Sequence, residues 1–442
     1  MQNFRRLAFA KLLPRFAKSY LKLLKLATED LLGQALSSTL LSQKSHQPFC
    51  MSRTISTGID IGTHQVKVVI AESSRESDRY APKIIGIGFA ESKGLRHGYI
   101  INRDDTIRSI RQAVRAAEKM AEVSVKKACI AIGGIGLSGT TSVGSVIISR
   151  ADSEITDLDV EKVIASAKAA LPQNATLNRR ILHTIPTQFK IDGKQVLGRP
   201  LGLKASRLEV RVLFIICMEN HVDDLLDATE EVGIGISDVV AAPVAASVVT
   251  LTKTQKIAGV VLANIGSETA SIIVYENNLP ISLEVFPIGS NEITNDIALG
   301  LKIPLEEAED VKVGRLIGVS YPRKKLDEII EARLSDIFEL IEAHLKKINK
   351  NGLLPAGIVL TGGGSGIETI DDFAKAALRL PSRVASMTFS DKIKSQIKDA
   401  SWSVAYGLCI IGLTEDDGAS PGREFVRRTV NKFRVWLKQF LP

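Results

Sequence analysis

Two short loops of this chain place glycine and hydroxyl side chains at the bend between two strand-like segments. One reads DIGT at residues 60–63 and the other reads NIGS at 264–267, and apolar residues alternate on both sides of each. Glycine lets a backbone approach an anion closely, and successive N–H groups form a nest for it. The hydroxyls of Thr63, Ser267 and Thr269 add donors. The chemistry that these loops could perform is the binding of phosphate groups.

A carboxylate and a glycine run strengthen this interpretation. Asp60 ends the first strand-like segment, where it can orient water bound to Mg²⁺, a cation that needs few protein carboxylates. The turn Gly362-Gly363-Gly364 separates an apolar run from a predicted helix and allows close approach of a nucleotide. Each feature alone also fits an ordinary turn, so the prediction depends on their order along the chain. No G-x-x-x-x-G-K sequence is present, which excludes a P-loop enzyme.

Two other motifs have simpler interpretations. The spacing Gly134-x-Gly136-x-x-Gly139 matches a dinucleotide fingerprint, but that fingerprint requires a helix to follow. The residues that follow are strand formers, so we expect a bend between strands. His183 has no second histidine or cysteine at ligand spacing and is interpreted as a packed or solvated side chain.

Composition limits the class of protein. The chain has 442 residues, 45% of them apolar, which is enough for two compact lobes. Its four cysteines are scattered without a C-x-x-C pair, which argues against a disulfide framework or a zinc site. No uncharged apolar run of about 18 residues occurs, so we expect no membrane-spanning helix.

The net charge of +8 is concentrated at the two ends. Residues 1–50 carry +6 and residues 423–442 carry +5, which leaves −3 for the body. Basic ends on a mildly acidic body indicate an anionic surface that only the ends touch, rather than nucleic acid.

The C-terminal stretch predicts a helix that lies in a lipid interface. Its apolar residues recur at steps of three or four, and basic residues fill most of the remaining positions. A helix docked on its own protein is the alternative, but the linker-like sequence at 414–422 favours the membrane anchor. The residues concerned are Phe425, Val426, Val430, Phe433, Trp436, Leu437, Phe440 and Leu441 on the apolar side, with Arg427, Arg428 and Lys432 among the cations.

The N-terminal stretch is also basic and amphipathic, but charged residues interrupt its apolar core, which argues against a signal peptide. It is either a second interfacial helix or upstream sequence that is not translated, because Met51 stands just before the first strand.

The elements that must position these loops repeat along the chain. Strand-like segments at 55–71 and 83–92 precede a helix at 104–122, capped near Asp104 or Asp105, with Ile107, Ile110 and Val114 on its apolar face. From residue 257 a similar strand–turn–strand layout begins again, about 200 residues after the first. Such a duplication implies two related domains that face each other, with residues 128–236 forming an α+β unit between them.

The order of these motifs resembles the actin, Hsp70 and sugar-kinase superfamily, and within it the bacterial cell-division family FtsA. GIDIGTHQVKVVIAES and VVLANIGSETASIIVYENNLP are similar to its two phosphate loops. RILHTIPTQFKIDG, GRPLGLKASRLEVRVLFIIC and DVVAAPVAASVVTL resemble its inserted subdomain and interdomain connection, and GIVLTGGGSGIETI continues the match. The insert and the amphipathic tail are the specific features.

The resemblance implies an α/β, actin-like two-domain ATPase fold with an inserted α+β subdomain and a C-terminal amphipathic helix. The expected divisions are an N-terminal extension (1–54), a first-domain core (55–127), the insert (128–236), a return to the first domain (237–257), a second-domain core (258–295), its outer lobe (296–353), a return through the second to the first domain (354–413), a linker (414–422) and the membrane helix (423–442).

The resemblance also implies a function: a cell-division protein that binds ATP and Mg²⁺, polymerises, and tethers filaments of the tubulin-like protein FtsZ to the cytoplasmic face of the cell membrane at the division site. Other division proteins are expected at the insert. The expected cofactor-binding residues are Asp60, Gly62, Thr63, Gln65, Asn264, Gly266, Ser267, Thr269, Lys312, Gly362, Gly363 and Gly364, with Asp60 also reaching Mg²⁺ through water; those for the FtsZ C-terminal peptide are Arg323, Lys324 and Arg333.

Several residues depart from the family pattern. The second loop has Asn264 and Ser271 where aspartates are usual, and Ser267-Glu268 where two glycines are usual; Gln65 replaces a common lysine. A lost carboxylate, a lost cation and a Glu268 that faces the phosphates all weaken the stabilisation of charge on the phosphates and Mg²⁺. We therefore predict nucleotide binding with slow or absent hydrolysis.

Two alternatives remain at the level of sequence. A pilus-assembly actin homologue similar to PilM shares the fold and the insert, binds a membrane protein's cytoplasmic peptide and needs no lipid helix. A sugar or carboxylate kinase needs a catalytic base beside a substrate cleft, and the sequence shows no clear one.

Overall fold

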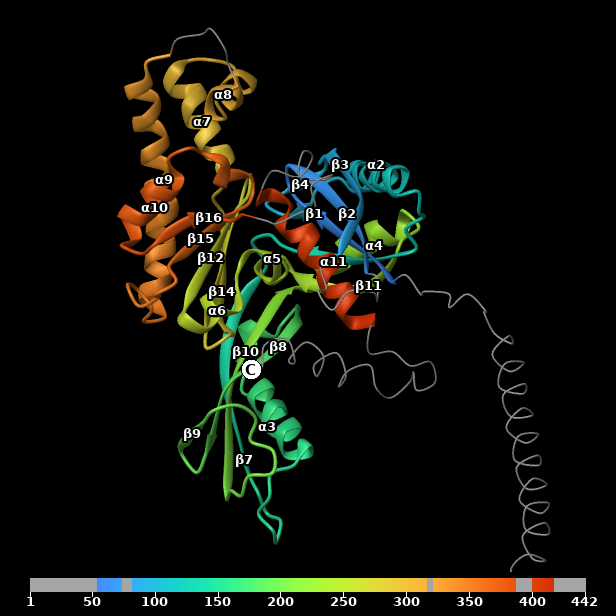
Figure 1. Cartoon of the computed structure of the whole chain (residues 1–442), viewed down its shortest axis with the longest axis vertical. Helices are drawn as coiled ribbons and strands as arrows, with labels where there is room; N and C mark the ends of the chain where they lie inside the picture. Colours follow the sequence, from blue (N-terminus) through green and yellow to red (C-terminus); the bar gives the residue numbers. More distant parts are fainter. Residues whose placement is uncertain (1–53, 74–81, 316–320, 387–399, 417–442) are drawn as a thin grey trace, which may run out of the picture. The chain divides into compact units, whose positions relative to one another are not determined.

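The structure is a computed structural model that describes residues 54–73, 82–315, 321–386 and 400–416, which are coloured along the chain in Figure 1. The N-terminal extension and the membrane helix expected at 423–442 lie outside the described residues. Among the helices that are described, none combines the length and the apolar character needed to cross a bilayer.

The first loop lies within a five-stranded sheet of order β11-β6-β1-β2-β3. Strand β1 pairs antiparallel with β2 and parallel with β6, and α2 packs on the sheet through β2 and β3. The apolar face expected for α2 is buried, whereas its N-cap is Asn102, which precedes the expected aspartates. These elements are β1 (Thr54–Ile61), β2 (Gln65–Ser73), β3 (Lys83–Glu91), β6 (Lys127–Ile132), β11 (Gly235–Ala241), α2 (Arg103–Ala121), and the small hairpin β4 (Leu95–Arg96) and β5 (Tyr99–Ile100).

The second loop lies in a sheet built the same way, of order β14-β13-β12-β15-β16. Strand β12 pairs antiparallel with β13 and parallel with β15, as β1 does with β2 and β6. The internal duplication expected from the sequence is therefore present in the pairing of the strands. The elements are β12 (Val260–Ile265), β13 (Ala270–Glu276), β14 (Leu279–Phe286), β15 (Ile358–Thr361), β16 (Ser382–Val384), α7 (Ser290–Leu301), α8 (Leu305–Lys312), α9 (Arg323–Lys347) and α10 (Ile370–Leu378).

The insert is a four-stranded sheet of order β7-β10-β8-β9, packed on α3 (Figure 1). Its own core includes Val163, Leu208, Val212 and Phe214. This sheet occupies a narrower span than the expected unit 128–236, because β6 and β11, which lie near the two ends of that unit, pair within the first sheet. The elements are β7 (Ser138–Ile147), α3 (Asp157–Ala169), β8 (Arg179–Ile191), β9 (Lys194–Val196) and β10 (Arg207–Met218), followed by α4 (Glu219–Glu231).

Two helices join the lobes. Helix α5 (Ala242–Thr250) and α11 (Ser403–Asp416) pack against each other, with α6 (Lys253–Ala258) and the short turn η3 (Ala400–Trp402) beside them. Helix α11 also packs on β1 and β2, and α5 contacts β12 and β13. Helix α11 continues to Asp416, so residues 414–416 of the segment expected as a linker are helical.

Candidate functional site: a phosphate cradle between two duplicated hairpins

The two loops occupy the same position in their hairpins. In the first, Ile61 pairs with Val66 across the bend, and in the second, Ile265 pairs with Ala270. Four residues therefore form each bend, 62–65 and 266–269, and the polar position just before the bend is Asp60 in one hairpin and Asn264 in the other. The chemical match seen in the sequence is a match of backbone register as well.

The second loop is held through its carbonyl groups. The N–H groups of Ser290 and Asn291, at the start of α7, donate to the carbonyls of Gly266 and Ser267 at 2.9 and 2.8 Å. The N–H groups of Ser267, Glu268 and Thr269 donate to no acceptor among the described residues. Consecutive donors without a protein acceptor are what an anion nest requires, so this loop presents its backbone donors to a ligand.

Asp60 is half-buried at the end of β1. Desolvation raises its pKa to about 6, against the opposing effect of Lys67, its cross-strand partner on β2. The Lys67 ammonium donates to the carbonyl oxygen of Ser401 at 3.0 Å and to its hydroxyl at 2.7 Å, and lies over the Trp402 ring. A carboxyl that is costly to ionise in the protein alone is well suited to meet a hydrated cation.

The triple-glycine turn closes against the second hairpin. Gly362 has φ +89°, and a Cβ there would stand 2.4 Å from Oδ1 of Asn264. The neighbouring Thr361 hydroxyl donates to the carbonyl of Ala400 at 2.8 Å, which ties the turn to η3. The last two of these glycines begin the 3-10 turn η2 (Gly363–Gly366), and the turn lies between β15 and α10, as the sequence predicted.

Lys312 lies at the end of α8 with only 5% of its side chain exposed. Its ammonium donates to the Ser290 carbonyl at 3.2 Å and to the Thr294 hydroxyl at 2.8 Å, and pairs with Glu309 at 2.6 Å. Burial alone would raise the pKa of Glu309, but hydrogen bonds from Lys312 and Thr294, with the nearby charges of Lys312 and His64, lower it.

These contacts form one continuous series. It begins at Lys67 on β2, which follows the first loop, and passes to η3. It continues through Thr361 and Gly362 to the second hairpin, and through the start of α7 to Lys312. The two loops, the triple-glycine turn and Lys312 are together called the cradle.

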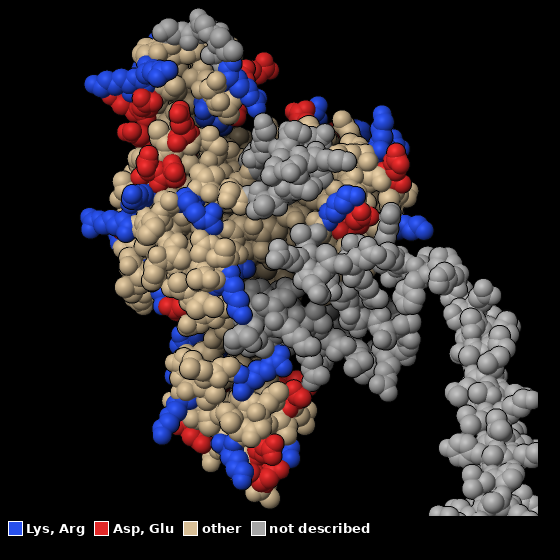
Figure 2. Space-filling view, in the orientation of Figure 1, with Lys and Arg blue, Asp and Glu red and all other residues tan. Residues whose placement is uncertain are grey.

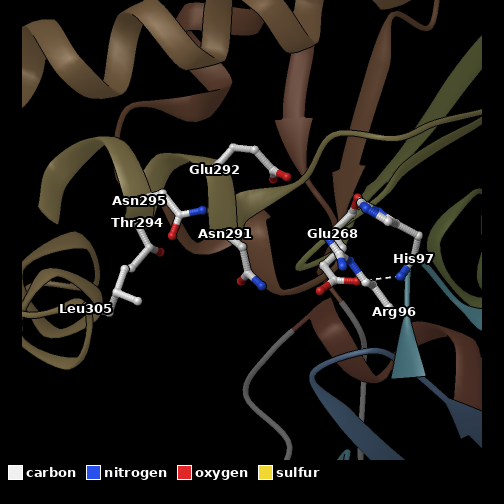
Figure 3. Close-up of a pocket in the computed structure, with 8 residues that line it drawn as sticks. All are labelled: Arg96, His97, Glu268, Asn291, Glu292, Thr294, Asn295 and Leu305. Carbon is white, nitrogen blue, oxygen red and sulfur yellow. Dashed lines mark hydrogen bonds between the residues drawn. The ribbon is translucent and has the colours of Figure 1, made fainter. Parts of the chain in front are cut away.

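Glu268 behaves differently from the prediction that it faces the phosphates. Its carboxylate accepts a hydrogen bond from the N–H of His97, in the β4–β5 turn, and its carbonyl lies 3.3 Å from Nδ1 of the same histidine. With Arg96 and His97 it forms one side of a polar pocket of about 340 Å³ whose other side belongs to α7 and the start of α8 (Figure 3). No residue predicted to bind the cofactor lines this pocket.

The residues predicted for the peptide contact lie apart from the cradle, on α9. Arg323 and Lys324 are exposed in its first turn. Arg333 is committed within the chain, since it pairs with Asp296 of α7 at 2.8 Å and with Asp336 at 3.1 Å. Residues 425–441, predicted to enter the membrane, lie outside the described residues.

Sequence reasoning missed Lys67 and His97. Lys67 could have been found, because antiparallel pairing across a four-residue bend places it opposite Asp60. His97 carries no pattern that identifies its partner, since Glu268 lies in the other lobe.

The remaining motifs have structural roles. Strand β7 follows the G-x-G-x-x-G sequence without a helix, as predicted. His183 is packed: its Nε2 accepts a hydrogen bond from the N–H of Ala241 at 3.0 Å, and burial lowers its pKa to about 4. The cysteines that the structure describes are buried free thiols, and its described part contains no cluster of side chains suited to a metal ion.

Comparisons with known proteins give one consistent result. A family model for "Cell division protein FtsA" matches residues 261–407, and one for the "SHS2 domain inserted in FTSA" matches residues 134–216. The cell division protein FtsA of Pseudomonas aeruginosa is 30% identical over 386 residues, which cover 82% of this chain and 90% of that protein. The FtsA of Borreliella burgdorferi is 31% identical over 384 residues, which cover 81% of this chain and 91% of that protein.

Among solved structures, the PilM–PilN type IV pilus biogenesis complex matches with a TM-score of 0.62 and 16% identity, covering 81% of this chain and 98% of that one. At that identity the likeness concerns the fold alone. The two-lobed, actin-like fold with its inserted domain is confirmed by these matches.

Proposed function

The chain belongs to the FtsA family of bacterial cell-division proteins, and from this premise we propose that it is an ATP-binding adaptor that tethers FtsZ filaments to the cytoplasmic face of the cell membrane. The observation that carries the nucleotide part of the proposal is the row of N–H groups in the second loop that have no acceptor among the described residues, next to the triple-glycine turn. The membrane part rests on the basic, amphipathic sequence of residues 423–442.

The cradle fits a Mg²⁺-nucleotide. The free N–H groups of the second loop and the hydroxyls of Thr63 and Ser267 supply donors for phosphate oxygens. Asp60 would orient water on a bound Mg²⁺, which would neutralise phosphate charge. The triple-glycine turn, where Gly363 has open space around it, would admit the nucleotide at close range.

We expect hydrolysis to be slow or absent. Asp60 and Asn264 occupy equivalent positions in the two hairpins, so only the first hairpin supplies a carboxylate there. The carboxylate of Glu268 is held by His97 and lines the neighbouring pocket. Without a second positioned carboxylate, a water molecule in the cleft lacks a general base.

The partner contact belongs to the outer lobe formed by α7, α8 and α9. The first turn of α9 offers Arg323 and Lys324 as exposed cations, whereas acidic side chains gather further along this helix, on the left of the view in Figure 2. Because Arg333 is already paired with Asp296, its role is to fix α9 on α7. The FtsZ C-terminal peptide therefore meets the first turn of α9 in this proposal, while self-association into protofilaments and contacts of the insert follow the family.

The membrane anchor combines a charge and an apolar term. Each cation near an anionic leaflet contributes about 1 kcal/mol, and each large side chain that is buried contributes about 1.5–3 kcal/mol. Residues 423–442 carry +5 and eight apolar residues of the predicted stripe. These two contributions oppose the entropic cost of ordering a helix at the surface.

Liposome co-sedimentation tests the proposal. The full chain is compared with a chain ending at residue 422, on vesicles with and without anionic lipid, with and without FtsZ and Mg²⁺-ATP. We expect the full chain to bring FtsZ down with anionic vesicles and the shortened chain to leave both in solution. A matched variant, Arg427→Glu with Arg428→Glu, should lose binding to anionic vesicles selectively. Equal lipid binding by the shortened chain would refute the anchor.

A peptide pull-down tests the partner separately. The FtsZ C-terminal peptide should be retained, and a cytoplasmic pilus-protein peptide should not. Arg323→Glu with Lys324→Glu should abolish retention, while Lys302→Glu, which changes an exposed cation at the end of α7, should leave it unchanged. Retention of the pilus peptide alone would favour the PilM-like alternative.

A further inference from the structure

We propose that Glu268 is a positioning residue that fastens the second phosphate loop to the β4–β5 turn, and that this turn couples the nucleotide site to the inserted subdomain. The proposal rests on the proposed nucleotide binding for its ligand, but its structural part stands on contacts among the described residues.

The first link joins the two lobes at the loop itself. Glu268 lies in the bend of the second hairpin, and both its carboxylate and its carbonyl reach one residue of the first lobe, His97. A carboxylate that accepts from a backbone N–H forms a charge-assisted hydrogen bond, which is stronger than a neutral one. The loop that offers its N–H groups to phosphate is thus attached to the opposite lobe by the residue in the middle of its bend.

The second link joins the β4–β5 turn to the loop at 133–137. A Cβ on Gly98 would stand 2.5 Å from the Cα of Gly134, so two backbones touch at this point. The N–H of Ile135 donates to the carbonyl of His97 at 3.3 Å. The turn and this loop therefore move together, because neither has a side chain between them that could yield.

The third link reaches the root of the insert. Gly136 lies two residues before β7, and Met218 is the last residue of β10. A Cβ added to Gly136 would stand 2.5 Å from the Tyr99 hydroxyl oxygen and 3.2 Å from Cγ of Met218. The Tyr99 ring packs against His221 of α4 with centroids 4.5 Å apart, and Nε2 of His221 lies 2.9 Å from the Gly133 carbonyl. Tyr99 thus touches the chain where it enters the insert and where it leaves it.

The three links make one path from the phosphate loop to the insert. When phosphate oxygens draw the N–H groups of Ser267 to Thr269 toward them, the position of Glu268 changes, and His97 and Tyr99 follow. The G-x-G-x-x-G sequence finds its role here: its first two glycines admit the turn at close range. The insert therefore responds to the nucleotide, although no residue of the insert belongs to the cradle.

Hydrogen–deuterium exchange on the full chain tests this path with three proteins: the unchanged chain, Glu268→Gln and Glu268→Gly. Glutamine keeps an oxygen that accepts from the His97 N–H, whereas glycine removes it. Without nucleotide, we expect Glu268→Gly to speed exchange at His97 and in residues 134–147 by about tenfold, since one hydrogen bond contributes about that factor. Glu268→Gln should stay within a factor of about two to three.

Addition of Mg²⁺-ATP forms the second arm. We expect the unchanged chain and Glu268→Gln to show a nucleotide-dependent change of exchange in residues 134–147. Glu268→Gly should lose this change at a nucleotide concentration that saturates it, as measured with a fluorescent ATP analogue. Asn295→Ala, which changes another side chain of the same pocket and leaves His97 untouched, is the control and should behave as the unchanged chain.

The outcomes separate the two proposals. A nucleotide-dependent change that persists in Glu268→Gly, or exchange in 134–147 that is equal in all three proteins without nucleotide, overturns the coupling. If exchange in residues 134–147 rises equally in Glu268→Gln and Glu268→Gly, the coupling is also overturned. The loss of the negative charge, and not of the hydrogen bond, would then explain the effect. If the unchanged chain binds no nucleotide, the proposed function fails, and the first arm alone still decides whether Glu268 holds the root of the insert.

Discussion

Replacing Asp60 with asparagine should stabilise the nucleotide-free protein while it removes Mg²⁺-dependent nucleotide binding. Burial raises the pKa of Asp60 from 3.8 to about 6, so the folded chain holds this proton more tightly than the unfolded chain does. Between pH about 4 and about 6 the unfolded chain has lost the proton and the folded chain has not, and rising pH therefore favours unfolding. The stability lost by pH 7 is at most about 3 kcal/mol, at about 1.4 kcal/mol for each pKa unit.

Asp60→Asn removes this pH-dependent cost and keeps the shape of the side chain. We expect the free energy of unfolding of the variant to equal that of the unchanged chain near pH 4 and to exceed it by up to about 3 kcal/mol at pH 7. The duplicated hairpin offers the matched reversal, Asn264→Asp, which introduces a carboxyl at the equivalent position. That variant should lose stability as the pH rises from about 4 to 7.

Urea unfolding at pH 4.5 and 7.5 measures these differences, and thermal shifts with Mg²⁺-ATP measure binding. A ligand that binds only the folded chain adds RT ln(1 + [L]/Kd) to its stability. The unchanged chain should gain this term with Mg²⁺ present, and Asp60→Asn should lose the part that depends on Mg²⁺. If Asp60→Asn matches the unchanged chain at both pH values, the carboxyl is not desolvated and the argument for its role at the cation fails.

Three further predictions concern the cradle and its chemistry. Gly362→Ala should destabilise the protein by about 2–4 kcal/mol in urea unfolding, because alanine must adopt a left-handed conformation and its Cβ meets Asn264; Gly363→Ala, with open space around it, should cost under about 1 kcal/mol. Lys312→Met should weaken binding of a fluorescent ATP analogue indirectly, because it removes the contacts that hold α8 on the start of α7 beside the second loop, whereas Lys302→Met should have no effect. Phosphate release from ATP should be far slower than the median enzyme rate of about 10 s⁻¹, and turnover at that rate would refute the role given to Asn264.

Local patterns of the sequence predicted most of the elements and the positions of the two hairpin bends. Alternating apolar residues fix which face of a strand is buried, and a four-residue bend fixes the register of a hairpin, so these local patterns suffice to place both loops. The duplication followed because the same local rules apply twice. The pairing of β1 with β6 and of β12 with β15 could not be derived in this way, since parallel neighbours are joined by long crossovers.

The boundaries of the insert also depend on long-range strand pairing and not on local sequence. An apolar run such as β6 has the same composition whether it lies in the first sheet or begins the insert, and only its hydrogen-bonded partner, β1, decides between them. Helix α11 likewise passes through Thr414 to Asp416, although the acidic, glycine-containing sequence there is typical of a linker.

What the sequence determined by itself is therefore the chemistry available: two hairpin bends with hydroxyls and glycines, one carboxylate at Asp60, a triple-glycine turn and two basic ends. What only the tertiary structure decided is which groups meet. Lys312 finds Ser290 and Thr294, and Glu268 turns to His97, 171 residues away, instead of toward the phosphates. The reason is physical: residue type and spacing fix local geometry, but a contact between lobes depends on packing of the whole chain, which no local pattern records.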